Sequence, residues 1–356
     1  MMNSRSLAFL KKLVGSIGPS GYEDEAAQVW EKEAKTFADE VRRDSHGNTI
    51  ALVNKGGNPR IMIAGHTDEI GFIITHVDDE GFLWIGPVGG WDPQIVLGQR
   101  VTIRGKKGHV PGVIGNCPIH LMSPESRKKI VEISDMWVDI GAKSRREALR
   151  FISIGDPLVL ADQLELLPGD LAVARGLDNR AGAFVVLEAA RMLNTLKPTA
   201  EIYAVATVQE EIGLRGAKTA AYGIDPHVGI AIDVTFATDQ PGLGNAVRRE
   251  GRIKLGSGPV MTRGPNINAK LFTLLESTAK SKKIPYQVNA EPGATGTDAN
   301  ALQLSRAGVA TALVSIPNRY MHSPCEMVSL KDLDASAKLL AHTCVRITGR
   351  TRFIPF

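Results

Sequence analysis

The sequence predicts an α/β protein: a three-layer, mostly parallel sheet with helices on both faces, plus an inserted small β-barrel. Continuous apolar runs such as 202–208 and 228–234 are typical of buried parallel strands. Segments with helical spacing alternate with these runs, as in α/β folds. Between residues 70 and 165 the texture changes to short alternating runs separated by glycine-containing turns, which is typical of a barrel.

The elements before the barrel follow from spacing and turn residues. Apolar residues recur at helical intervals over 7–17, and a second helix is expected over 23–38. The stretch 41–53 alternates around His46-Gly47-Asn48, which predicts two strands joined by a turn. A short apolar strand over 60–64 leads into a polar segment.

The barrel segment is predicted to divide the α/β domain in two. Its turn signals include 78–81 and 105–108, and 144–151 is its one helix candidate. We therefore expect a discontinuous catalytic domain of residues 1–69 and 166–356, with residues 70–165 as the insertion.

The α/β pattern returns after residue 169. Asp178 is a plausible N-cap for a helix that reaches Leu193, and Ser329 and Asp332 have the spacing of a capping box. The other expected elements are helices over 217–222, 269–281 and 330–347 and strands over 202–208, 228–234 and 310–316.

The composition excludes several classes of protein. Of 356 residues, 43% are hydrophobic and 22% charged, and the net charge of +4 comes from scattered basic residues, which argues against a nucleic-acid surface. The three cysteines are far apart and form no paired motif, so a reducing, cytoplasmic location is expected. No apolar stretch reaches the length of a membrane span, so no membrane association is expected.

The adjacent carboxylates Glu210 and Glu211 follow a predicted buried strand. Two like charges in one place repel each other unless a cation lies between them. One explanation is a metal site in which one glutamate binds the ion and the other takes a proton from a metal-activated water. The simpler interpretation is an acidic loop that faces solvent.

Four further metal-ligand candidates support the metal hypothesis. His66, Asp233 and His322 lie at or just beyond the ends of predicted strands, and Asp178 begins a helix at the same edge. Ligands of open α/β sheets bind outside the carboxyl ends of the strands. Each residue alone is commonly a hydrogen-bonding or capping residue. Together with Glu211 they suit two divalent ions, Zn or Co or else Mn, that share one carboxylate.

Two more carboxylates complete the candidate site. Asp68 lies two residues after His66, where it can accept the imidazole N–H and fix its tautomer. Glu210 is then left as the general base. The spacing does not exclude the opposite assignment, in which Glu210 is the ligand and Glu211 the base.

These residues lie in motifs that resemble one family. The motifs are Gly65-His66-Thr67-Asp68-Glu69-Ile70-Gly71, Gly176-Leu177-Asp178-Asn179-Arg180-Ala181-Gly182, Val208-Gln209-Glu210-Glu211-Ile212-Gly213, Asp233-Val234-Thr235, Thr295-Gly296-Thr297-Asp298-Ala299 and Arg319-Tyr320-Met321-His322-Ser323-Pro324. The sequence resembles the cytosolic dinuclear metallo-aminopeptidases, which include the tetrahedral aminopeptidases and bacterial glutamyl aminopeptidase.

The resemblance implies a role for each residue. His66 and Asp233 would complete one metal site, Glu211 and His322 the other, with Asp178 bridging them. Glu210 would be the general base, and Asp68 the carboxylate that accepts the His66 N–H. Thr297 and Asp298 are also expected to line the substrate pocket.

The resemblance further implies an exopeptidase that removes N-terminal residues from short peptides. The insertion would form dimers, and the dimers would assemble into a tetrahedral dodecamer. Related deacylases and carboxypeptidases carry their extra domain between the fourth and fifth ligands, whereas here the insertion lies between His66 and Asp178, which favours an aminopeptidase. An endoglucanase is the other alternative, but it would need only a carboxylate pair and leaves His66 and His322 unexplained.

Overall fold

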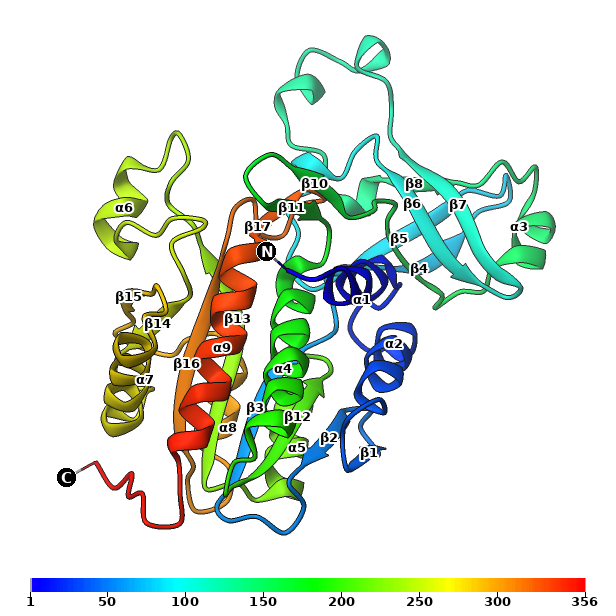
Figure 1. Ribbon diagram of the computed structural model, residues 1–356. Helices are drawn as coiled ribbons and strands as arrows, with labels where there is room; N and C mark the ends of the chain where they lie inside the picture. The colour runs from blue at the N-terminus through cyan, green and yellow to red at the C-terminus, as the bar shows by residue number, and fades with distance from the viewer. Residues whose placement is uncertain (1, 356) are drawn as a thin grey trace.

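The computed structural model describes residues 2–355 and is built on an eight-stranded mixed sheet with helices on both faces (Figure 1). In spatial order the strands are β1 (Glu40–Arg43), β2 (Thr49–Val53), β12 (Glu201–Thr207), β3 (Arg60–His66), β13 (Val228–Phe236), β16 (Ala310–Asn318), β14 (Val260–Arg263) and β15 (Gln287–Ala290). The central strands β12, β3, β13 and β16 are parallel to one another. Their continuous apolar sequences follow from burial on both faces.

Helices cover both faces of this sheet. In Figure 1, α4 (Leu177–Leu196) and α9 (Leu330–Arg346) lie in front of the central strands, and α5 (Arg215–Ile224) and α8 (Asp298–Gln303) lie behind them. The remaining helices of the α/β part are α1 (Ser4–Gly15), α2 (Asp24–Ala34), α6 (Gly244–Glu250) and α7 (Ala269–Lys282). The expected three-layer architecture is therefore confirmed.

A closed six-stranded barrel projects from one end of the sheet (Figure 1). Its strands, in order around the barrel, are β4 (Gly71–Val77), β5 (Leu83–Val88), β8 (Trp137–Asp139), β7 (Gly108–Gly115), β6 (Arg100–Gly105) and β9 (Pro157–Leu160), and α3 (Arg145–Phe151) precedes β9. The barrel encloses its own apolar core. The predicted β insertion is confirmed as an architecture, whereas its behaviour as a separate domain with limits at 70 and 165 stays a prediction.

A small antiparallel sheet was not expected from the sequence. It joins β10 (Glu165–Leu167) and β11 (Leu171–Ala174) to the distant β17 (Glu326–Ser329). These strands are three or four residues long, which is too short for a periodic signal. In addition, β17 pairs with β11, which lies more than 150 residues earlier in the chain. The short elements α6, α8, β14 and β15 escaped prediction for the same reason.

One expected helix cap is wrong, and a second is confirmed only in part. Asp178 has non-helical dihedral angles (φ −80°, ψ 106°), and the side chain that caps the regular part of α4 belongs to Asn179, whose Oδ1 accepts the Gly182 N–H at 3.0 Å. Near α9, Ser329 accepts the Lys331 N–H as expected, but Asp332 does not complete a capping box because it accepts backbone N–H groups from a different segment.

No helix within residues 2–355 is both long and apolar enough to cross a membrane.

Candidate metal centre

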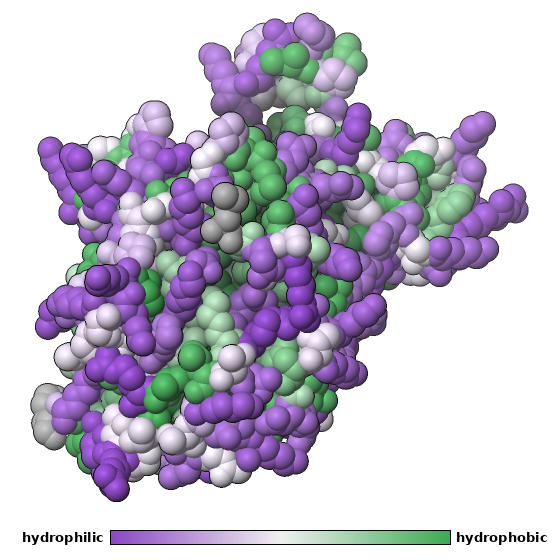
Figure 2. All heavy atoms as spheres, viewed as in Figure 1, coloured by the Kyte–Doolittle hydropathy of each residue, from purple (hydrophilic) through white to green (hydrophobic). Residues whose placement is uncertain are grey.

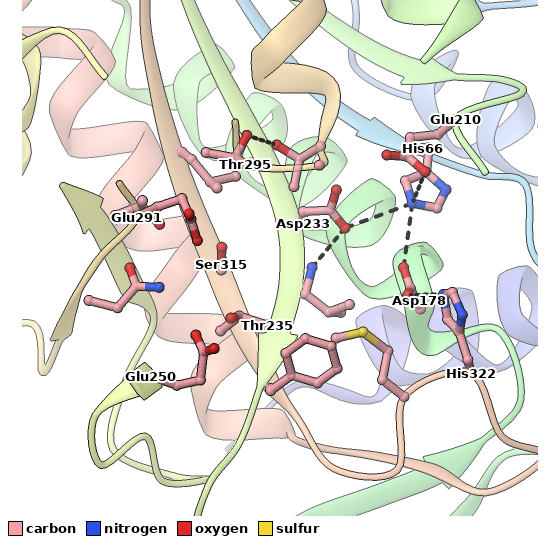
Figure 3. Close-up of a pocket in the computed structure, with 18 of the residues that line it drawn as sticks. His66, Asp178, Glu210, Asp233, Thr235, Glu250, Glu291, Thr295, Ser315 and His322 are labelled. Carbon is pink, nitrogen blue, oxygen red and sulfur yellow. Dashed lines mark hydrogen bonds and ion pairs between the residues drawn. The ribbon is translucent and has the colours of Figure 1, made fainter. Parts of the chain in front are cut away.

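The candidate ligands converge at the carboxyl edge of the central strands (Figure 3). His66 is the last residue of β3, and Glu210 and Glu211 lie in the turn after β12. Asp233 lies inside β13 rather than just after the strand, because β13 continues to Phe236. Parallel strands end at one edge of a sheet, so these four side chains meet there.

The other two ligand candidates come from outside these strands. Asp178 lies at the irregular start of α4, and His322 lies in the loop between β16 and β17. The two carboxylate oxygens of Asp178 face different imidazoles: Oδ1 lies 3.4 Å from His66 Nε2, and Oδ2 lies 3.3 Å from His322 Nε2. Asp178 therefore stands between two groups of ligand atoms.

Each group contains one imidazole and one further carboxylate. Asp233 Oδ1 lies 3.7 Å from His66 Nε2, and Glu211 Oε1 lies 3.5 Å from His322 Nε2. In each group of three residues, one nitrogen or oxygen per residue lies within 4.8 Å of the others. Glu210 also reaches the first group, with Oε2 at 3.7 Å from His66 Nε2.

These distances fit divalent ions bound by nitrogen and oxygen. Ligand atoms around a tetrahedral zinc ion lie about 3.4 Å apart, because the metal–ligand bonds are about 2.1 Å long. The four pairs that join Asp178, Asp233 and Glu211 to the imidazoles span 3.3 to 3.7 Å. The ligand groups thus suit two ions that share Asp178.

Both histidines direct Nε2 toward the carboxylates. His66 Nδ1 lies 3.1 Å from the backbone carbonyl of Asp68, and His322 Nδ1 lies 2.9 Å from the carbonyl of Gly90. An Nδ1–H donated to a carbonyl leaves Nε2 unprotonated and available to a metal. Gly90 follows β5, so the barrel segment helps to orient a residue of the sheet edge.

Asp68 contributes in a way that the sequence did not reveal. Its carboxylate lies 3.4 Å from His66 Nδ1, slightly farther than its own carbonyl. The same carboxylate accepts the backbone N–H groups of Glu210 at 3.1 Å and Glu211 at 3.2 Å, and the Ser20 hydroxyl at 2.6 Å. Asp68 therefore fixes the turn that presents both glutamates.

The charges at the site are unbalanced without a cation. Burial raises the pKa of Glu210 to about 10 and the pKa of Asp233 well above its usual range. Burial opposes protonation of His66, yet Glu210, Asp178 and Asp68 raise its pKa well above the usual value. Hydrogen bonds that the His322 imidazole donates to the carboxylates of Asp178 and Glu211 raise the pKa of His322 to about 11. Buried carboxylates that retain protons mark a site in which positive charge is needed.

Glu326 is a functional candidate that sequence reasoning missed. It is buried, and its carboxylate accepts the Asp178 N–H at 2.7 Å and the His322 N–H at 2.9 Å. It thus links the backbones of two ligands that are 144 positions apart. Its only sequence signal is a glutamate four residues after His322, which is too common to be informative.

A cavity of about 340 Å³ opens beside the ligand groups. Thr297 lines it as expected, together with Gly296. Asp298 does not: it is buried behind the cavity, where its carboxylate accepts the Thr207 hydroxyl at 2.6 Å.

Comparison with known proteins identifies the family. Residues 47–339 match the family model described as M42 glutamyl aminopeptidase. The chain belongs to the M42 aminopeptidase family. The match spans most of the chain and includes all the candidate ligands.

Two relatives named as aminopeptidases are similar to this chain over most of its length. The chain is 42% identical over 336 residues to lysyl aminopeptidase of Pyrococcus furiosus, covering 93% of this chain and 94% of the relative. It is 33% identical to glutamyl aminopeptidase of Lactococcus lactis, covering 77% of each chain.

Solved M42 structures share the fold. A TET aminopeptidase from a marine sediment archaeon of the Thaumarchaeota superposes with a TM-score of 0.91 at 37% identity, covering 97% of this chain and 98% of that one. The TET1 peptidase of Pyrococcus horikoshii, described as assembling into a tetrahedron or a large octahedral shell, gives a TM-score of 0.85 at 33% identity and covers 96% of this chain and 100% of that one. The resemblance stated from the motifs is confirmed, as is the expected class of enzyme, a hydrolase acting as an aminopeptidase.

Proposed function

We propose that this aminopeptidase removes the N-terminal residue of short peptides with two divalent metal ions. His66, Asp178 and Asp233 would hold one ion, and Asp178, Glu211 and His322 the other. The observation that carries the proposal is the position of Asp178, whose two carboxylate oxygens face two different imidazoles, those of His66 and His322. When bound, such ions polarise a scissile carbonyl, acidify water and stabilise the developing oxyanion.

The proposed ligands suit zinc, cobalt and manganese, and their chemistry does not distinguish among the three ions. Imidazole and carboxylate ligands suit all three ions, and availability in the cell decides between them.

Glu210 is proposed as the general base. Its carboxylate lies beside the first ligand group, and Asp68 holds its backbone in place. Glu210 would accept a proton from the attacking water and deliver it to the leaving amine. Burial raises its pKa to about 10, which suits proton delivery, while nearby cations would lower the pKa toward the range of a base.

The partner class is a short peptide with a free N-terminus, together with other copies of this chain. Self-association into a tetrahedral dodecamer is supported by a TET1 structure described as a dodecamer and by the TET1 peptidase described as assembling into a tetrahedron or a large octahedral shell. We further propose that residues 70–165 form the dimer contact. Cytoplasmic residence, expected from the cysteines, stays a prediction.

The endoglucanase alternative has one observation in its favour. A Thermotoga maritima structure described as an endoglucanase superposes with a TM-score of 0.76 at 27% identity. A glycosidase would use the carboxylates Glu210 and Glu211. A glycosidase mechanism would give no role to the imidazoles of His66 and His322, whose Nε2 atoms point at carboxylates. We therefore expect no hydrolysis of carboxymethylcellulose.

The proposal is tested with aminoacyl anilides. Chelation should abolish hydrolysis, and zinc, cobalt or manganese should restore it; activity that survives complete metal removal contradicts the metal proposal. Glu210→Gln should keep its metal content and lower kcat by about 10²- to 10⁴-fold. The matched variant Glu211→Gln should lose metal. If Glu210→Gln loses metal and Glu211→Gln does not, the two roles are exchanged.

A further inference from the structure

The cavity beside the ligand groups contains a second pair of carboxylates. Figure 3 shows Glu250 and Glu291 on the side of the pocket opposite His66 and His322. Glu250 ends α6, and Glu291 directly follows β15. These two residues belong to none of the ligand groups.

Glu291 has no cationic partner in the described part of the chain. Its Oε1 accepts the Gly293 N–H at 3.3 Å, and no Lys, Arg or His nitrogen of residues 2–355 forms an ion pair with it. Glu250 pairs with its neighbour Arg249 at 2.6 Å, but the Arg249 side chain is 82% exposed. Water screens such an exposed pair, so it neutralises Glu250 only weakly.

Asn289 lines the same cavity. Its Oδ1 is buried and accepts no hydrogen bond within the described residues. Because this oxygen has almost no accessible surface, Glu250 and Glu291 are the acceptors that this part of the cavity offers to a ligand.

The cavity lining also includes apolar surface that suits an aliphatic chain. Phe236, Leu313 and Met321 line the cavity and supply apolar surface. No Lys or Arg of the described residues lines it. A long cationic side chain buries its methylenes against such a wall and keeps its charged end at polar groups.

The overall charge favours the same type of ligand. At the end of the cavity next to the proposed metal ligands, the four carboxylates of Asp178, Glu210, Glu211 and Asp233 would balance the charge of two divalent cations. Glu291 then has no cationic partner within the described residues, and Glu250 has only the exposed Arg249. Both glutamates lie in a concave, partly desolvated site, where charge complementarity discriminates strongly between ligands.

We infer that Glu250 and Glu291 select substrates whose N-terminal residue carries a cationic side chain, lysine or arginine. The inference rests on the proposed aminopeptidase function. The side chain crosses the cavity, and its ammonium or guanidinium group donates hydrogen bonds to these carboxylates.

The first test compares anilides of lysine, arginine, norleucine and glutamate with the wild-type enzyme. Lysine and norleucine share an aliphatic chain and differ in the terminal ammonium. We expect kcat/KM for lysine to exceed that for norleucine by about tenfold or more, because a charge-assisted hydrogen bond contributes at least that factor. The arginine anilide shows whether the site distinguishes a guanidinium group from an ammonium group. Equal or better turnover of norleucine or glutamate overturns the inference while leaving the aminopeptidase function intact.

The second test uses Glu250→Gln, Glu291→Gln and the double variant. Lysine turnover should fall by about tenfold per carboxylate, while norleucine turnover stays near wild type and reports intact folding and metal binding. Glu80→Gln, in an exposed turn of the barrel, is the matched control. An unchanged ratio of lysine to norleucine in the double variant overturns the inference. If the wild-type enzyme hydrolyses none of the anilides, the proposed function itself is overturned.

Binding gives a readout without turnover. In the Glu210→Gln background, calorimetry should show tighter binding of L-lysinamide than of L-norleucinamide. Adding Glu250→Gln and Glu291→Gln should remove that difference. Equal affinities before these substitutions contradict the inference.

Discussion

At the residue scale, two carboxylates near this site act by accepting backbone hydrogen bonds as well as by their charge. Asp68 accepts two backbone N–H groups from the Glu210 turn, and Glu326 accepts one from Asp178 and one from His322. Both are buried and lie behind the ligands. The geometry of the candidate metal centre therefore depends on residues that are not themselves among the proposed ligands.

Glu326→Ala should weaken metal binding by about 10- to 100-fold, because the backbones of Asp178 and His322 lose their shared acceptor. Glu326→Gln retains one amide oxygen and should lose less. Metal content during competition with a chelator gives the measurement, with exposed Glu165→Ala as the control. Unchanged affinity in Glu326→Ala would show that the ligands hold their positions without it.

At the scale of elements, the carboxylate of Asp332 links α9 to the loop before β14. It accepts the N–H groups of Gly256 and Gly258, both at 2.7 Å. Both glycines have positive φ angles, of 75° and 93°, so this loop takes a conformation that other residues adopt rarely. The first turn of α9 thereby positions β14, next to the strand that supplies Asn289.

Asp332 should make stability depend on pH. Burial raises its pKa to about 6 in the folded state, against about 3.9 in an unfolded chain. A raised pKa means that the folded state binds the proton more tightly. The contribution is therefore full below pH 4 and is lost as the pH rises through 6, by up to about 3 kcal/mol.

Unfolding of the wild type and Asp332→Asn, measured between pH 4 and pH 7, tests this expectation. The wild type should lose free energy of unfolding relative to the variant as the pH rises. Asp334→Asn, at a half-exposed neighbour on α9, controls for the change in net charge. Parallel profiles for wild type and Asp332→Asn would contradict the assignment.

At the scale of the whole molecule, the barrel both supports the site and exposes apolar surface. Gly90 holds His322 from the barrel side. The long segment between β7 and β8 exposes Ile119, Leu121 and Ile130 at 59%, 78% and 55%. Figure 2 shows hydrophobic and hydrophilic residues mixed on the loop that projects at the top of the molecule. Such exposed apolar side chains are typical of an interface.

Replacing Ile119 and Leu121 together by Asp should reduce the size of the assembly, because charges would enter a contact that excludes water. Light scattering measures the particle mass. Leu304→Asp, at a leucine of the α/β part that is 79% exposed, tests whether any exposed leucine has this effect. An assembly of wild-type size in the double variant would place the subunit contact elsewhere.

Much of the α/β part was predictable because its signals are local. Apolar continuity identified β3, β12, β13 and β16, and helical spacing identified α1, α4, α7 and α9. Short elements such as β17 and α6 carried no such signal, since distant pairing rather than local sequence stabilises them. The cap at Asp178 was wrong because its carboxylate is directed at two imidazoles instead of the helix.

The sequence by itself determined the fold class, the inserted barrel and the family, because apolar strands, turn residues and motifs are local patterns of neighbouring residues. It also supplied the ligand candidates, since strand ends fall at one edge of a parallel sheet. Only the tertiary structure decided that Asp178 stands between two groups and that Glu326 and Gly90 hold the ligands. It alone brought Glu250 and Glu291 to one cavity, because such meetings depend on how distant segments pack, which no local pattern records.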